Sequence, residues 1–144
     1  MNILFFLTPK AEVACVDEDS TLRQALEKLE NSGFSALPII SKQGKYIGTI
    51  TEGDMLWYIK NNAYLNLFEA EDIPLQKVKR KRDNKAVSIS ENIDSLWEKV
   101  MNQNFVPVVD DLGNFTGIVT RKDILRYLSG AQTAEGARSL RKIV

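Results

Sequence analysis

Gly48-Thr49-Ile50-Thr51-Glu52-Gly53-Asp54 recurs 69 residues later as Gly117-Ile118-Val119-Thr120-Arg121-Lys122-Asp123. The run Leu37-Pro38-Ile39-Ile40 recurs at the same offset as Val106-Pro107-Val108-Val109. Further upstream, where Val16 matches Val87, the offset is 71, so the second copy has lost two residues between its first helix and the strand that follows. A repeat that keeps its order twice indicates a duplicated structural unit.

Each copy carries the same predicted elements. An apolar stripe at i, i+3, i+4 and i+7 predicts an amphipathic helix near the start of each. The two stripes comprise Leu22, Ala25, Leu26 and Leu29, then Ile93, Leu96, Trp97 and Val100. Asp19 and Ser20 are candidate N-caps of the first helix. Two short strands joined by a turn follow, and second helices are expected at Met55–Ile59 and Ile124–Leu128. The prediction is an α/β fold of two strand-helix-strand-strand-helix units that pack together, because neither covers both faces of its small sheet.

The expected boundaries are a first repeat with its N-terminal segment at 1–62, a linker at 63–79, a second repeat at 80–129 and a weakly structured tail at 130–144. Asn61-Asn62 is expected to end the preceding helix. The run Lys77–Lys85 contains six basic residues in nine. It is either a solvated linker or a segment in which Arg80 or Arg82 reaches the phosphates of a ligand.

Composition excludes several functional classes. The chain has 19 basic and 19 acidic residues, which is unlike a dedicated nucleic-acid binder. It contains no histidine and a single cysteine, Cys15, so neither a histidine-based catalytic pair nor a cysteine-based zinc cluster or internal disulfide can form. The apolar run Ile3–Leu7 is too short for a membrane span or a signal core. We therefore expect a cytoplasmic protein with no metal, membrane or nucleic-acid partner.

The duplicated Gly-hydrophobic-hydrophobic-Thr-x-x-Asp pattern, preceded by a proline in an apolar strand, resembles the CBS domain over roughly residues 10–62 and 80–129. The resemblance implies tandem βαββα repeats paired about a pseudo-twofold axis, with two clefts between them and commonly a homodimer. It also implies a regulatory module that binds adenine nucleotides (AMP, ADP, ATP or cyclic di-AMP) and signals to an effector protein, with no cofactor required.

By position, the resemblance makes Thr51 with Asp54 and Thr120 with Asp123 the groups that contact phosphate and ribose. It places Ala36, Leu37, Phe105 and Val106 at the base, with backbone contacts from Val13–Cys15 (Val13 and Ala14 above all) and Val87–Ile89. A strand that ends in Thr and opens a helix also directs backbone N–H groups and the helix dipole at one point, which suits an anion. The alternative interpretation of Thr-x-x-Asp is a helix capping box, a role that is compatible with lining a cleft. The alternative for the base-lining residues is simple core packing.

The copies differ where a phosphate would lie. Glu52 follows Thr51 and would repel it, whereas Arg121 and Lys122 follow Thr120 and would attract it. The hypothesis is that Thr120 and Arg121 hold the phosphate end. The deletion leaves Asn102-Gln103-Asn104 where the first copy has Gly33, which leaves open whether one cleft or both take a ligand.

Two other functional classes remain. One is a structural dimerisation module with unoccupied clefts. Whether the clefts are empty or occupied, the motif helices offer Met55, Leu56, Ile59, Leu125 and Leu128 as candidates for a dimer surface, and core packing is the equal alternative for them. The other is an enzyme, which we do not expect. Its carboxylates would be Glu52, Asp54 and Asp123, and Lys122 and Cys15 have no evident activating partner.

Overall fold

A computed structural model describes residues 2–62 and 66–130. The first repeat holds a three-stranded sheet in the order β2-β3-β4. Its elements are β2 (Val16–Asp17), α1 (Leu22–Ser32), β3 (Ala36–Ile40), β4 (Tyr46–Thr51) and α2 (Glu52–Asn61). β2 runs parallel to β3, and β3 runs antiparallel to β4. This is the predicted strand-helix-strand-strand-helix unit.

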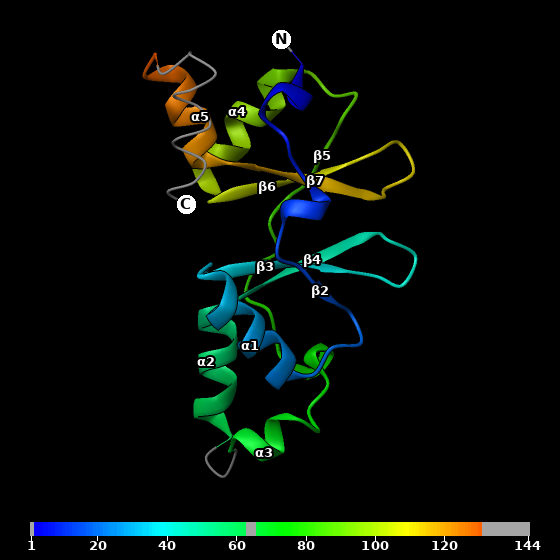
Figure 1. Cartoon of the computed structure of the whole chain (residues 1–144), viewed down its shortest axis with the longest axis vertical. Helices are drawn as coiled ribbons and strands as arrows, with labels where there is room; N and C mark the ends of the chain where they lie inside the picture. Colours follow the sequence, from blue (N-terminus) through cyan, green and yellow to red (C-terminus); the bar gives the residue numbers. More distant parts are fainter. Residues whose placement is uncertain (1, 63–65, 131–144) are drawn as a thin grey trace.

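The second repeat reproduces the unit. Its elements are β5 (Val87–Ser88), α4 (Ile93–Asn102), β6 (Phe105–Val109), β7 (Phe115–Thr120) and α5 (Arg121–Leu128). β5 and β6 are parallel, β6 and β7 antiparallel, and a further strand β1 (Thr8–Pro9) extends the sheet beside β7. The two sheets face each other in the middle of the molecule, with α1 and α2 on one outer side and α4 and α5 on the other (Figure 1). The predicted α/β class and tandem repeat are confirmed.

The N-cap of the first helix lies one residue after the two candidate caps. The N-cap of α1 is Thr21, whose Oγ1 accepts the Gln24 N–H at 3.2 Å while the Thr21 N–H donates to Gln24 Oε1 at 2.9 Å. This reciprocal capping box needs a side-chain acceptor three residues after the cap, which Gln24 supplies to Thr21. The prediction of Asp19 or Ser20 was therefore wrong. α2 ends at Asn61 with Asn62 as its C-cap, as predicted.

Three hydrophobic cores form layers along the molecule. In each repeat the helices bury their apolar stripe against their own sheet. The third core lies between the two sheets and consists of Ala36, Ile40, Phe105, Phe115 and Ile118. Burying side chains of this size contributes about 1.5–3 kcal/mol each. The β-hairpins also meet at their tips, where the Phe115 N–H donates to Gly44 O at 2.8 Å.

The segments that precede the repeats are exchanged between them. The N-terminal 3-10 turn buries Ile3 and Phe6 in the core of the second repeat, and Thr8 pairs with Ile118 on β7. In the opposite direction, Leu75 and Val78 fill the core of the first repeat. Each repeat therefore packs against the segment that leads into the other.

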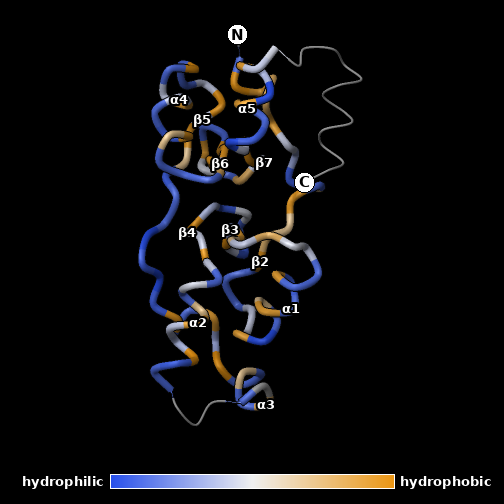
Figure 2. The backbone as a smooth tube through the Cα atoms, turned by 90° about the vertical axis from the view of Figure 1, so that its left-hand side faces the viewer, coloured by the Kyte–Doolittle hydropathy of each residue, from blue (hydrophilic) through white to orange (hydrophobic). Residues whose placement is uncertain are grey.

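The linker between the repeats holds α3 (Leu67–Ala70) and the 3-10 turn Leu75–Lys77. The basic run that follows is the hydrophilic trace along one side of the molecule (Figure 2). Nearly all of the predicted tail, residues 131–144, lies outside the described residues. Among the helices of the described segments, none combines the length and apolar character needed to cross a bilayer.

Candidate functional site

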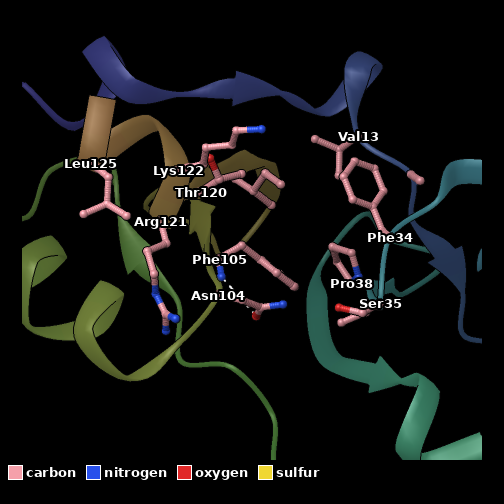
Figure 3. Close-up of a pocket in the computed structure, with 13 residues that line it drawn as sticks. Val13, Phe34, Ser35, Pro38, Asn104, Phe105, Thr120, Arg121, Lys122 and Leu125 are labelled. Atoms are coloured by element: carbon pink, nitrogen blue, oxygen red, sulfur yellow. Dashed lines mark hydrogen bonds between the residues drawn. The ribbon is translucent and has the colours of Figure 1, made fainter. Parts of the chain in front are cut away.

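Two clefts lie between the repeats, and we name them by the motif that each contains. Cleft A, with a volume of about 340 Å³, contains Thr120. The first repeat lines it with Val13, Ala14, Phe34, Ser35, Ala36 and Pro38. The second repeat lines it with Asn104, Phe105, Ile118, Thr120, Arg121, Lys122 and Leu125. The two sets of side chains face each other across the opening in Figure 3.

Cleft B contains the other motif and measures about 720 Å³. The first repeat contributes Thr51, Gly53, Asp54 and Trp57. The second contributes Lys81, Arg82, Asn84, Asn102, Gln103 and Asn104. Each cleft therefore joins the motif helix of one repeat to the segment before the first strand of the other. We call these segments the first arm (residues 8–15) and the second arm (residues 79–86).

Cleft A combines an apolar slot with a cationic end. Phe34 and Pro38 stand on one side of the opening and Phe105 on the other (Figure 3). Thr120 and Lys122 lie at the second repeat's side, where α5 begins. Flat apolar walls beside a hydroxyl and a cation offer contacts for an aromatic ring that carries an anionic group.

The backbone at the start of α5 is less open than the sequence predicted. The Arg121 N–H donates to Asn104 O at 3.0 Å, and the Asp123 N–H donates to Thr120 Oγ1 at 3.1 Å. These two bonds satisfy N–H groups that the strand-to-helix corner was expected to leave free. An anion in cleft A would therefore be contacted chiefly by side chains.

Arg121 is anchored beside the cleft. Its Nε donates to Val100 O at 3.0 Å, in the last turn of α4. In Figure 3 its side chain extends away from Phe34, whereas Lys122 reaches toward the first arm. The guanidinium contributes positive charge at the edge of cleft A. The Lys122 amine is better placed than the guanidinium to contact a group inside the cleft.

The two motif carboxylates both act within the protein. Asp54 is buried, accepts the Thr51 N–H at 3.1 Å and completes a reciprocal capping box. Its other oxygen accepts the Lys81 N–H at 3.0 Å. Asp123 accepts the Thr120 hydroxyl at 2.9 Å, and its Oδ1 lies 3.5 Å from Arg126 Nη1. Asp54 lines cleft B, whereas Asp123 is not among the residues that line cleft A.

The base-lining residues divide according to the pleat of the strands. Ala36 and Phe105 line cleft A, while the next residues, Leu37 and Val106, are fully buried in the cores of their own repeats. Successive side chains of a strand point to opposite faces, so only one of each pair can reach the cleft. Val87 is likewise buried, whereas Asn84, three residues earlier, lines cleft B.

The arms are held in different ways. The first arm joins β7 through backbone pairing, with Pro9 opposite Gly117. The second arm is held by side chains, because Asp83 Oδ1 accepts the Thr49 N–H at 2.9 Å and pairs with Arg80 Nε at 2.7 Å. Burial would raise the pKa of Asp83, but the hydrogen bonds from Arg80 and Thr49 and the charge of Arg80 lower it below the ordinary value.

Tyr46 adds a further contact on the second arm. Its hydroxyl donates to Asn84 O at 2.6 Å and lies 2.6 Å from Thr49 Oγ1. Burial raises the pKa of Tyr46 to about 12, with a smaller increase from the charge of Asp83. The phenol therefore stays protonated and holds the arm across the physiological pH range.

Sequence reasoning missed several residues of cleft A, among them Phe34, Asn104 and Leu125. Phe34 lies two residues before Ala36, so the alternation of an extended chain would have suggested that it shares the face of Ala36. Asn104 and Leu125 have no comparable signal, because their positions depend on how the repeats are docked.

Several known proteins are similar to this chain in sequence or in fold. The uncharacterized protein MJ1404 of Methanocaldococcus jannaschii is 32% identical over 117 residues, which are 78% of this chain and 26% of that protein. The chain thus spans about a quarter of that relative's length. Among solved structures, CbpB in complex with c-di-AMP has a TM-score of 0.79 at 27% identity, covering 90% of this chain and 85% of that chain. Listeria monocytogenes CbpB in complex with c-di-AMP has a TM-score of 0.72 at 26% identity, covering 89% and 95%.

The sequence model of the CBS domain matches this chain twice, at residues 7–61 and 71–130. The two matches coincide with the two repeats of the structure, together with the segments that lead into them. The chain therefore belongs to the CBS-domain family.

Proposed function

We propose that this protein is a regulatory module that binds an adenine nucleotide in cleft A and signals its presence to a partner protein. The observation that carries the proposal is the pairing, in one cleft, of an apolar slot with the hydroxyl of Thr120 and the amine of Lys122. A nucleobase fits the slot, and its sugar-phosphate extends toward the cationic end.

The ligand class is supported by similar structures. CbpB has been solved in complex with c-di-AMP, and this chain covers 85% of that protein at 27% identity. An adenine ring flanked by Phe34 and Phe105 would gain stacking energy of about 1–3 kcal/mol. AMP, ADP, ATP and c-di-AMP share this ring and differ in their phosphates, so the phosphate end selects among them.

Each predicted binding residue has a proposed role. Val13 and Ala14 on the first arm present backbone to the edge of the base, and Ala36 and Phe105 border the ring. Thr120 and Arg121 serve the phosphate end, with Lys122 added. Thr51 and Asp54 belong to cleft B, and Asp123 positions the Thr120 hydroxyl. Leu37 and Val106 support the strands from the core side of each sheet.

Signal transmission is proposed to pass through a homodimer. Leu56 and Leu125 occupy equivalent positions on α2 and α5, and both are more than half exposed, as is Leu128. Met55 is fully buried and Ile59 partly buried against the core, so the exposed leucines are the dimer-surface candidates. A ligand that contacts both repeats favours the docking geometry in which both contacts are made, and the partner protein responds to that geometry.

The rival function is a structural dimerisation module whose clefts stay empty. Thermal unfolding of the full chain with AMP, ADP, ATP or c-di-AMP, and with GMP for comparison, separates the two. A ligand at 100 times its Kd stabilises the native state by about 2.7 kcal/mol, so at least one adenine compound should raise Tm by several degrees.

Phe34→Ala should abolish most of that shift, because the residue lines the slot. Phe68→Ala is the matched control, since Phe68 is exposed on α3 and lines neither cleft. If none of the adenine compounds moves Tm, the sensor proposal is wrong and the structural module is favoured.

A further inference from the structure

Cleft B differs from cleft A at the positions that form the base slot. The repeat offset of 69 residues aligns Gln103 with Phe34, and the upstream offset of 71 aligns Lys85 with Ala14. Phe34 is partly exposed and lines cleft A, whereas Gln103 is only 7% exposed although it lines cleft B. A buried amide therefore stands where the other cleft has an aromatic ring.

The Gln103 amide is bonded to the backbone of the second arm. Its Oε1 accepts the Lys85 N–H at 2.8 Å, and its Nε2 donates to Lys85 O at 3.0 Å and to Phe105 O at 3.2 Å. A neighbouring amide strengthens this arrangement, since Asn84 Nδ2 donates to Phe105 O at 3.2 Å and to Asn104 Oδ1 at 3.3 Å. These bonds leave the polar groups of the slot satisfied from within the chain.

This pattern matches what a nucleobase edge would offer. Adenine presents an amino donor beside a ring-nitrogen acceptor, and a glutamine amide presents the same pair to one residue's backbone C=O and N–H. The equivalent residue in cleft A, Ala14, receives no side-chain hydrogen bond from any residue in the described parts of the chain. Ala14 lines cleft A.

The two-residue deletion removes one residue from the first helix of the repeat, which shortens from 11 to 10 residues, and one from the connection that holds Gln103. In the first repeat three residues join α1 to β3, beginning with Gly33 in the left-handed region at φ 73°. In the second repeat only Gln103 and Asn104 join α4 to β6, and Gln103 is itself the C-cap of the helix. Gln103 therefore takes the helix C-cap position that Gly33 holds in the first repeat.

We infer that Gln103 is a built-in occupant of the base slot of cleft B, so that each chain binds one nucleobase, in cleft A. This inference rests on the proposed function of cleft A and adds its stoichiometry. Cleft B keeps its volume and its polar walls, but the Gln103 amide already bonds the Lys85 N–H and C=O that would receive the edge of a base.

Titration calorimetry of the full chain with AMP, which carries a single base, tests the inference. The wild type should bind one AMP per chain. Gln103→Ala should bind two, because the Lys85 N–H and C=O become available to a second base. Phe34→Ala should lose the wild-type site, and the double variant should retain one.

Different outcomes separate the inference from the proposed function. Two AMP bound by the wild type, or one bound by a folded Gln103→Ala variant, would overturn the role of Gln103 and leave cleft A intact. No binding to the wild type with one AMP on Gln103→Ala would reject the function of cleft A and keep the role of Gln103. No binding to either protein would reject both.

Photolabelling of the wild type keeps the test independent of whether Gln103→Ala folds. After irradiation with 8-azido-AMP, peptide mapping should find label near Ala14 or Phe34. Label near Lys85 or Gln103 at comparable yield would contradict the inference.

Discussion

Cleft A and cleft B come from the same duplicated unit, yet one is apolar with a cationic end and the other is lined by amides and charges. The difference arises because each cleft takes its motif from one repeat and its slot from the other. Cleft A joins the slot of the first repeat, with Phe34, to the motif of the second, with Lys122. Cleft B joins Gln103 to a motif in which Glu52 follows Thr51.

Because each cleft combines residues of both repeats, sequence divergence between the repeats can place an apolar slot and basic side chains in the same cleft. The first repeat has the apolar slot residue, Phe34, but its motif carries the acidic Glu52. The second repeat has the polar Gln103 in its slot, but its motif carries the basic Arg121 and Lys122. Docking about the pseudo-twofold axis places the apolar slot of the first repeat beside the basic motif of the second, in cleft A. Cleft A can then bind a ligand while the Gln103 side chain occupies the base slot of cleft B.

The largest expected effect comes from the way each arm is held. A Cβ added at Gly117 would lie 2.1 Å from Thr8 O, a backbone atom, so Gly117→Ala should displace the first arm from β7. We expect a loss of about 3 kcal/mol in the free energy of unfolding, together with loss of nucleotide binding in cleft A. Urea denaturation and calorimetry measure both.

Gly48 is the equivalent position in the first repeat and serves as the matched comparison. Its added Cβ would meet side-chain atoms of Asp83 and Arg80 at 2.7 and 2.8 Å, and these atoms can move aside. Gly48→Ala should cost about 1 kcal/mol and leave cleft A binding within twofold. Equal losses for the two variants would mean that the arms are held alike.

A smaller effect is expected from the charges beside the motif threonines. Arg121→Ala removes positive charge at the edge of cleft A and should weaken ATP binding about tenfold, or about 1.4 kcal/mol. Glu52→Ala, at the equivalent position, should change the affinity less than twofold. Calorimetric titration showing the same effect for both variants would reject the assignment of the phosphate end to Thr120 and Arg121.

The smallest effect concerns the second arm and depends on pH. The pKa of Asp83 is lowered in the folded protein, so its stabilising contribution is present above its ordinary pKa of about 3.9 and is lost as pH falls through the folded value. Because the side chain is 40% exposed, solvent screens the pair, and Asp83→Asn should cost no more than about 1 kcal/mol at pH 7.

Urea denaturation of wild type and Asp83→Asn at pH 7 and pH 3 checks this, with the exposed Asp72→Asn as control. The difference between the two proteins should be smaller at pH 3 than at pH 7. An equal difference at both pH values would show that the carboxylate charge does not hold the second arm.

The repeats, their elements and the family pattern could be predicted because they depend on local periodicity. Leu22, Ala25 and Leu29 are buried as their spacing predicts, and α2 ends at Asn61. The capping-box alternative for the Thr51 motif is also confirmed, since Asp54 accepts the Thr51 N–H. Local sequence contains this information because caps and stripes involve residues three or four apart.

The pairing of arms and clefts could not be predicted in the same way. Nothing near Val13 indicates that it lies opposite Thr120 and not Thr51, because that choice is made by the docking of two sheets. Leu37 and Val106 are a different case, since the alternation of the strand already implied that they face away from Ala36 and Phe105. The role of Gln103 required both the deletion and the position of Lys85 to be known.

The exchanged segments also determine how the chain can be divided. A fragment that stops at Asn62 would lack Leu75 and Val78, and a fragment that starts at the second repeat would lack Ile3 and Phe6. Each half would keep its own strands yet leave an open hydrophobic face. The duplicated unit is thus no longer an independent domain, and the smallest autonomous folding unit of this protein is the pair.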